Sequence, residues 1–259
     1  MTHLYGKDEF LSDEFQRNQV VYADDLAMVI VPKQAYVENY VMIAPTKQVE
    51  FFDQITPETL GAMWALVEML DFVLTKHVKN YSGYTLMINR GISAGQKVPH
   101  VHIHYFPHMR GEVEHPLYTQ IKPNAHKNTD PGIEIRYTSI QKLLADGPRN
   151  EQVLKKTAVT FNTLPGTHPA QILIHCMGAS RPHQMGSTAL RQLLNLLQTM
   201  VAKDNTYARG TKGYNIIFPQ QNYVYTPIDG VGFEISLITR SLDEAESPLK
   251  RLALKNTEK

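Results

Sequence analysis

Val98-Pro99-His100-Val101-His102-Ile103-His104-Tyr105-Phe106 contains three histidines at alternate positions. Because successive side chains of a β-strand point to opposite faces, this spacing predicts three imidazoles on one face of a single strand. Val101, Ile103 and Tyr105 would lie on the opposite face and pack against a core. The pattern therefore separates a reactive face from a buried one.

A turn-rich stretch stands directly before this segment, and it reads Asn89-Arg90-Gly91-Ile92-Ser93-Ala94-Gly95-Gln96-Lys97. Its glycines allow backbone amides to approach an anion closely. Histidine is neutral or charged near pH 7 and can act as a nucleophile or a proton donor, so the combination favours phosphate chemistry. Imidazoles at alternate strand positions also suit zinc, and a metal site is the alternative interpretation.

The overall composition indicates a folded, water-soluble protein with a small ligand. The 259 residues carry 26 Lys and Arg against 25 Asp and Glu, so no basic surplus favours a polymeric nucleic acid as partner. Cys176 is the one cysteine, which excludes an internal disulfide and suits a reducing compartment. No apolar run could span a membrane, and residues 1–9 do not resemble a signal peptide. We therefore expect a cytoplasmic protein with no membrane partner.

The first half of the chain is expected to be an α+β unit. Apolar runs from Val20 to Ala27 and from Tyr40 to Ala44 flank a turn and predict two antiparallel strands. Thr56 is a suitable N-cap for a helix with Pro57 at its first position, followed by an apolar stripe that includes Trp64. This helix should cover a sheet that contains residues 84–88 and the histidine strand.

The second half repeats this order in a weaker form. Residues 121–132 are polar and rich in proline, asparagine and lysine, so they predict a linker between a domain at 1–120 and a domain at 133–259. Residues 171–174 suggest a strand, and a helix starting at Ser187 or Thr188 follows. Residues 213–217 then resemble residues 83–87, and Gly232, Glu234 and Ser236 fall at the histidine positions. A divergent internal repeat that has lost its imidazoles would leave one active site per chain.

Residues 91–104, with Ala94-Gly95-Gln96 before His-x-His-x-His, resemble the histidine triad (HIT) family of nucleotide hydrolases and transferases. The resemblance covers about the first 110 residues. It implies a HIT-like antiparallel sheet with helices, duplicated here within one chain as a pseudo-dimer, with higher oligomers possible. It also implies that His102 attacks the α-phosphorus of a small nucleotide and forms a covalent nucleotidyl-histidine. No metal or other cofactor is needed for this reaction.

The remaining site residues follow from the same resemblance and from the chemistry of each side chain. His104 would protonate the leaving group, and the ring of His100 would orient His102. The amides of Gly95, Gln96 and Lys97, with the side chains of Asn89 and Gln96, would hold phosphate oxygens. An alternative role for Asn89 and Gln96 is to satisfy the backbone of the loop.

Two positions depart from the family pattern. Tyr40 stands where HIT proteins usually have a fourth histidine, and a tyrosine cannot share a proton near neutral pH as an imidazole does, so the rate would fall. Residues 28–31 are wholly apolar and lack the usual acid for the ribose hydroxyls. These departures keep two other functions open: a weak or inactive nucleotide-binding module, and a dinucleoside polyphosphate phosphorylase.

Four further residues are interpreted as structural. His168, His175 and His183 share no strand or helix period, so surface or turn positions are expected. Cys176 lies beside an apolar strand with no base nearby in sequence, which is typical of a small core residue.

Overall fold

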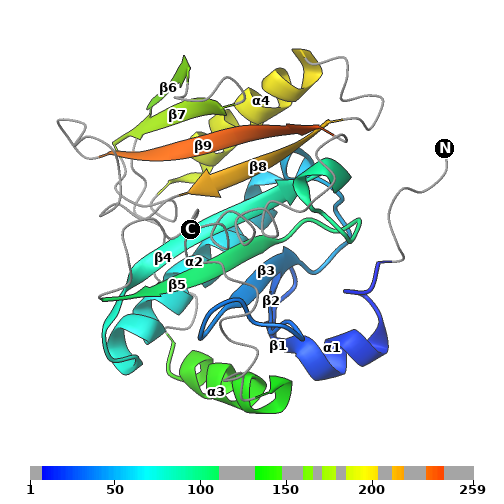
Figure 1. Cartoon of the computed structure of the whole chain (residues 1–259), viewed down its shortest axis with the longest axis vertical. Coiled ribbons are helices and arrows are strands. Elements are labelled where there is room, and N and C mark those ends of the chain that lie inside the picture. The colour runs from blue at the N-terminus through cyan, green and yellow to red at the C-terminus, as the bar shows by residue number, and fades with distance from the viewer. Residues whose placement is uncertain are drawn as a thin grey trace, which may run out of the picture.

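A computed structural model of the protein describes residues 8–110, 132–147, 160–165, 171–178, 185–203, 212–218 and 232–241. One α+β assembly of antiparallel strands and covering helices results (Figure 1). In chain order the elements are α1 (Asp13–Gln19), β1 (Val20–Ala23), β2 (Ala27–Ile30), β3 (Val41–Pro45), η1 (Phe52–Gln54), α2 (Pro57–His77), β4 (Tyr81–Arg90), η2 (Ile92–Ala94), β5 (Ile103–Met109), α3 (Ile133–Ala145), β6 (Thr160–Pro165), β7 (Gln171–Met177), α4 (Ser187–Lys203), β8 (Lys212–Phe218) and β9 (Gly232–Ser241).

All the described strands belong to a single sheet with the order β1-β2-β3-β5-β4-β8-β9-β7-β6. Every pairing in it is antiparallel, as the sequence predicted. Strands of the first half occupy one side of the sheet, strands of the second half occupy the other, and β4 pairs with β8 where they meet (Figure 1). The histidine strand β5 therefore lies inside the sheet, between β3 and β4.

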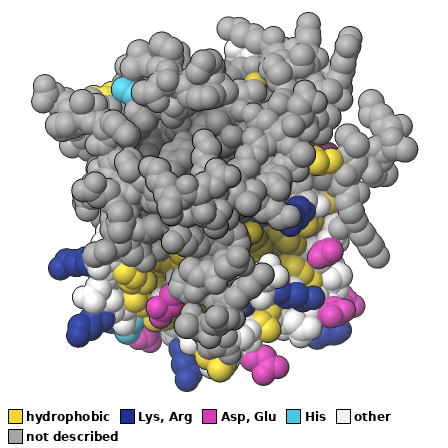
Figure 2. All heavy atoms as spheres, viewed as in Figure 1, with side chains coloured by type: hydrophobic (Ala, Val, Ile, Leu, Met, Phe, Trp, Pro, Cys, Tyr) yellow, Lys and Arg dark blue, Asp and Glu magenta, His cyan; other side chains and the backbone are white. Residues whose placement is uncertain are grey.

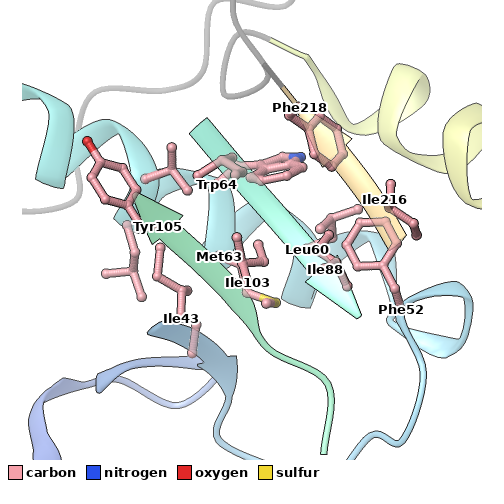
Figure 3. Close-up of a cluster of buried hydrophobic side chains, with 14 of the residues drawn as sticks. Ile43, Phe52, Leu60, Met63, Trp64, Ile88, Ile103, Tyr105, Ile216 and Phe218 are labelled. Atoms are coloured by element: carbon pink, nitrogen blue, oxygen red, sulfur yellow. The ribbon is translucent and has the colours of Figure 1, made fainter. Parts of the chain in front are cut away.

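The two halves share one hydrophobic core. The long helices α2 and α4 contact each other, and α2 starts as expected, with the side chain of Thr56 accepting a hydrogen bond from the amide of Thr59. Trp64 of α2 meets Phe218 of β8 edge to face, with 5.3 Å between ring centroids (Figure 3). Trp64 therefore lies at a contact between the two halves. The largest cluster of buried residues therefore includes side chains from both halves, while a second cluster around Phe10, Met28 and Phe106 belongs mainly to the first half.

The first predicted strand is wrong in one respect, because residues 20–27 do not form a single strand. Asp24 interrupts the run, and its carboxylate accepts hydrogen bonds from the amides of Leu26 and Ala27, both at 2.8 Å. Aspartate favours such turns because its side chain bonds its own backbone two residues on. The chain therefore reverses there and forms β1 and β2 instead.

Helix α3 bears on the expected domain boundary. The predicted linker at 121–132 lies outside the described residues except for Gly132, and α3 follows it directly. Although the sequence places α3 in the second half, Arg136 donates to the carbonyl oxygens of Pro32 and Lys33, and Tyr137 donates to that of Val20. Helix α3 thus packs on elements of the first half.

The surface shows no concentration of one charge over the described part of the face in Figure 2. Lysine and arginine side chains there alternate with aspartate and glutamate around hydrophobic side chains. Within the described residues, no helix is long and apolar enough to cross a membrane.

Candidate active site

The histidine segment differs from the predicted single strand. Strand β5 begins at Ile103, so His104 lies in the strand, while His100 lies in a bend before it and His102 directly precedes it. The alternation still holds, because Val101, Ile103 and Tyr105 are fully buried in the core on the other face. Before β5 the backbone bonds to a loop instead of a neighbouring strand, since the amide of Val101 donates to the carbonyl of Val49.

His102 is held as a neutral imidazole. Its Nδ1 donates to the backbone carbonyl oxygen of His100 at 3.0 Å, so the proton lies on Nδ1 and the lone pair on Nε2. Burial disfavours the charged ring and lowers the pKa of His102 to about 4, although the bond to His100 opposes part of this shift. At neutral pH, Nε2 of His102 therefore carries a lone pair, which is what a nitrogen nucleophile requires.

His100 supports His102 through its main chain rather than through its ring, which corrects the sequence expectation. The ring is occupied elsewhere: Nε2 donates to the carbonyl oxygen of Pro45 at 2.9 Å, and Nδ1 lies 3.0 Å from a carboxylate oxygen of Asp8. Phe10 covers both rings, with centroid distances of 5.3 Å to His100 and 5.2 Å to His102. Residues 8–10 thus help to bury the triad.

His104 lies between a phenol and an amide. Its Nδ1 is hydrogen-bonded to the Tyr40 hydroxyl at 2.6 Å, and its Nε2 lies 3.3 Å from the side-chain nitrogen of Asn89. Burial lowers the pKa of His104 well below its usual value and raises that of Tyr40 well above it, so both groups are neutral at pH 7. Tyr40 therefore contacts the triad through His104.

The loop before the triad is braced by Gln96. Its side-chain oxygen accepts from the amide of Gly91 at 2.7 Å, and its side-chain nitrogen donates to the carbonyls of Glu50 and Val98. The amides of Gly95 and Gln96 donate to carbonyls of the same loop, to Ile92 and Gly91. These contacts favour the alternative expectation, that Gln96 supports the loop, while the Lys97 side chain is exposed.

Two contributors to the site were missed by sequence reasoning. Asn215 of β8 pairs directly with Asn89 of β4, and its side-chain nitrogen donates to Asn89 Oδ1 at 2.8 Å and to the carbonyl of Ala94 at 2.9 Å. Asp8 reaches His100 from 92 positions away in the chain. No local pattern marks either residue, since each acts through contacts that only the folded chain creates.

Cys176 and the histidines of the second half lie away from the triad or outside the described residues. Cys176 is buried in the core as expected, and burial raises the pKa of its thiol. His175 lies in β7, whereas His168 and His183 fall outside the described residues. In the part of the chain that the structure describes, no three His, Cys, Asp or Glu side chains are placed to hold a metal ion.

Comparison with known proteins decides the family of the first half. The model of the HIT domain family matches residues 14–111, which include the elements from α1 to β5 and the whole triad. Residues 14–111 therefore belong to the HIT family. The HIT domain supplies one side of the shared sheet, up to its junction with β8.

Curated relatives match part of the chain. The bifunctional bis(5'-adenosyl)-triphosphatase/adenylylsulfatase FHIT of Arabidopsis thaliana is 34% identical over 97 residues, which are 37% of this chain and 53% of that protein. The bis(5'-adenosyl)-triphosphatase of Dictyostelium discoideum is 23% identical over 133 residues, which are 51% of this chain and 89% of that protein. The chain thus spans about half of the first relative and most of the second.

A solved structure extends over more of the chain at lower identity. An ADP-glucose phosphorylase from Arabidopsis thaliana, crystallised with ADP-glucose, covers 82% of this chain and 72% of its own with 14% identity and a TM-score of 0.48.

Proposed function

We propose that this chain is a nucleotidyl hydrolase or transferase in which His102 attacks the α-phosphorus of a nucleotide. The observation that carries the proposal is the hydrogen bond from His102 Nδ1 to the His100 carbonyl. It leaves the Nε2 lone pair available and gives the positive charge that develops on the ring an immediate partner.

The reaction has two steps. Nε2 of His102 forms a bond to the α-phosphorus while the bond from phosphorus to the leaving group breaks and its electron pair departs with that group. Water or another acceptor then attacks the same phosphorus, and the bond to His102 breaks with its electron pair returning to Nε2. His104 takes the proton of the attacking acceptor, because its ring lies 4.7 Å from that of His102, centroid to centroid.

The substrate class we propose is a dinucleoside polyphosphate, a nucleoside phosphoramidate or a related phosphoanhydride. Names of the relatives support it, since both the Arabidopsis and the Dictyostelium proteins are bis(5'-adenosyl)-triphosphatases. Asn89 and the backbone around Lys97 are the proposed phosphate contacts, while Tyr40 acts through His104. Near-neutral net charge and the single cysteine support a small nucleotide ligand and a cytoplasmic setting.

A covalent adduct tests the proposal directly. Wild-type protein is incubated with diadenosine triphosphate or adenosine phosphoramidate, quenched under alkaline conditions and analysed by intact mass. An acid-labile adenylyl adduct is expected on wild type and not on His102→Ala, with His77→Ala at the end of α2 as a histidine control that keeps the adduct. Turnover that continues unchanged in His102→Ala would contradict the role of His102, and wild-type protein without adduct or turnover would contradict the enzyme.

We also propose that the chain is an internal pseudo-dimer. The sequence alignment of residues 83–87 with 213–217 equates Met87 with Ile217, and these two residues are direct partners between β4 and β8. Met87 pairs with His104, and Ile217 pairs with Ser236, the residue aligned with His104. Equivalent registers on both sides of one central pair support a duplication in which the second copy lost its histidines.

A further inference from the structure

A chain of side-chain amides links the second half to the triad. The Ala94 carbonyl belongs to the loop before the histidines, Asn215 to β8, Asn89 to β4, and His104 to β5. Asn215 and Asn89 are buried and are paired residues of neighbouring strands, so their side chains share a face. The series ends at Tyr40, which is hydrogen-bonded to the other nitrogen of His104.

Hydrogen-bond chemistry fixes the direction of every bond in this series. A carbonyl oxygen only accepts, so the group of Asn215 that faces Ala94 is the amino group, and the same nitrogen donates to Asn89. The atom of Asn89 that receives this bond must be its oxygen. The amino group of Asn89 therefore faces His104 Nε2, which must accept, and the ring proton lies on Nδ1 and is donated to Tyr40.

We propose that Asn215 is a positioning residue of the active site, which sets the tautomer of His104 and thereby favours substrates whose leaving group departs without a proton. This inference rests on the proposed function. A phosphate leaving group departs from the α-phosphorus with its electron pair as an anion, so it needs no acid. The nitrogen of a phosphoramidate must gain a proton to leave as an amine, and the lone pair on Nε2 cannot supply one.

The same tautomer suits the second step. When water attacks the nucleotidyl-histidine, the amino group of Asn89 must first leave Nε2 of His104. Nε2 then takes the proton from water, and the resulting imidazolium keeps its Nδ1 bond to Tyr40. The proton then leaves to solvent or to the product phosphate. Burial, which lowers the pKa of His104, also keeps the resting ring neutral and its Nε2 unprotonated.

Asn215→Asp tests the proposal because a carboxylate keeps the shape of the side chain and removes the donor. Asn89 is then expected to turn its amino group toward residue 215 and its oxygen toward His104. The proton of His104 would move from Nδ1 to Nε2. Two-dimensional ¹⁵N–¹H spectra of the histidine rings measure this tautomer without any turnover.

Substrate preference supplies the second measurement. The ratio of kcat/KM for diadenosine triphosphate to that for adenosine phosphoramidate is expected to fall about 10-fold or more in Asn215→Asp, since a positioned proton donor contributes roughly 10²–10⁴-fold. Gln198→Ala is the matched control, because Gln198 donates across the halves to the Asp53 carbonyl, away from the triad. It should leave both the tautomer and the ratio unchanged.

Asn89→Asp covers the case in which a buried carboxylate at position 215 prevents folding. It still accepts from Asn215 and presents an acceptor to His104, so it should produce the Nε2–H tautomer and the same fall in the ratio. A wild-type ring protonated on Nε2, or a tautomer and ratio unaffected in these variants, would overturn the inference while leaving the adduct on His102 intact. Absence of adduct and turnover in wild type would instead overturn the proposed function.

Discussion

His102 Nδ1 donates to the backbone carbonyl of His100 at 3.0 Å, so the main chain of one histidine fixes the tautomer of the next. A side chain in place of this carbonyl could rotate away or be lost by mutation, whereas the backbone is present whatever residue stands at position 100. Chain geometry therefore sets the tautomer of the proposed nucleophile, and burial keeps its ring neutral.

Adduct formation is expected to persist in acid. The neutral ring is the reactive form, and burial lowers the pKa of His102 to about 4, so the reactive fraction stays high from pH 8 to pH 5. An ordinary histidine would lose most of its neutral, reactive fraction below pH 6.5. Single-turnover adenylylation with diadenosine triphosphate measured from pH 3.5 to 8 should give an acid limb near pH 4, and a limb near 6.5 would refute this prediction.

The stability of the fold should also depend on His102. Its pKa is lowered in the folded state, so between about pH 4 and 6.5 the unfolded chain binds more protons, and the free energy of unfolding falls as pH falls through that window. The shift from 6.5 to about 4 corresponds to about 3 kcal/mol. Urea denaturation at pH 4 and pH 7 should show a smaller difference for His102→Asn than for wild type, and equal differences would argue against the buried neutral ring.

Phe10→Ala is expected to raise the pKa of His102. Phe10 is 3% exposed and lies 5.2 Å from the His102 ring, so its removal admits water to a ring whose pKa is lowered mainly by burial. The pKa, followed by NMR titration, should move from about 4 toward 6.5, and the free energy of unfolding should fall by about 3 kcal/mol. Phe72→Ala, at a phenylalanine that is 48% exposed, is the control and should change neither. An unmoved titration in Phe10→Ala would show that this ring does not bury the nucleophile.

Tyr40→Phe removes the hydroxyl that meets His104 Nδ1. A buried ring nitrogen without its partner costs about 1–3 kcal/mol, so the free energy of unfolding should fall by that amount and turnover by about 10-fold.

Tyr40→His keeps a nitrogen that can accept and adds a group that shares protons near neutral pH. Turnover of adenosine phosphoramidate should therefore rise above wild type in Tyr40→His. Steady-state kinetics and urea denaturation of both variants decide this, and a Phe variant equal to wild type in both would contradict the role of Tyr40.

Sequence patterns predicted the parts of the fold that depend on local repetition. The cap at Thr56, the stripe of α2 and the alternation from Val101 to Tyr105 are all signals with a fixed period or spacing, and each is found in the structure. The limit of the histidine strand was wrong because strand pairing, which begins at Ile103, depends on partners in β3 and β4 rather than on alternation.

The site was predictable where its residues are close in sequence. His100, His102, His104 and the loop before them form one continuous motif, and Tyr40 was found because the family has a histidine there. Asp8 and Asn215 lie 92 positions before His100 and 126 positions after Asn89, and an isolated aspartate or asparagine carries no signal of a distant partner. Such contacts depend on tertiary packing, within the first half for Asp8 and between the halves for Asn215, which periodicity does not encode.

Gly213→Ala tests whether that packing positions the loop before the triad. A Cβ at Gly213 would lie 2.7 Å from the backbone nitrogen of Ala94 and 2.8 Å from the carbonyl oxygen of Arg90, and neither backbone atom can move aside cheaply. Overpacking of this kind costs about 1–3 kcal/mol, and the loop must shift away from β8. Because Ala94 also accepts from Asn215, the shift should lower kcat/KM together with the free energy of unfolding.

Gly61→Ala is the matched control, since its Cβ would meet nothing within 4 Å and alanine favours the interior of α2 by about 1 kcal/mol. Gly61→Ala should therefore gain stability at unchanged activity. Wild-type kinetics in Gly213→Ala would show that packing against β8 does not position the loop before the triad.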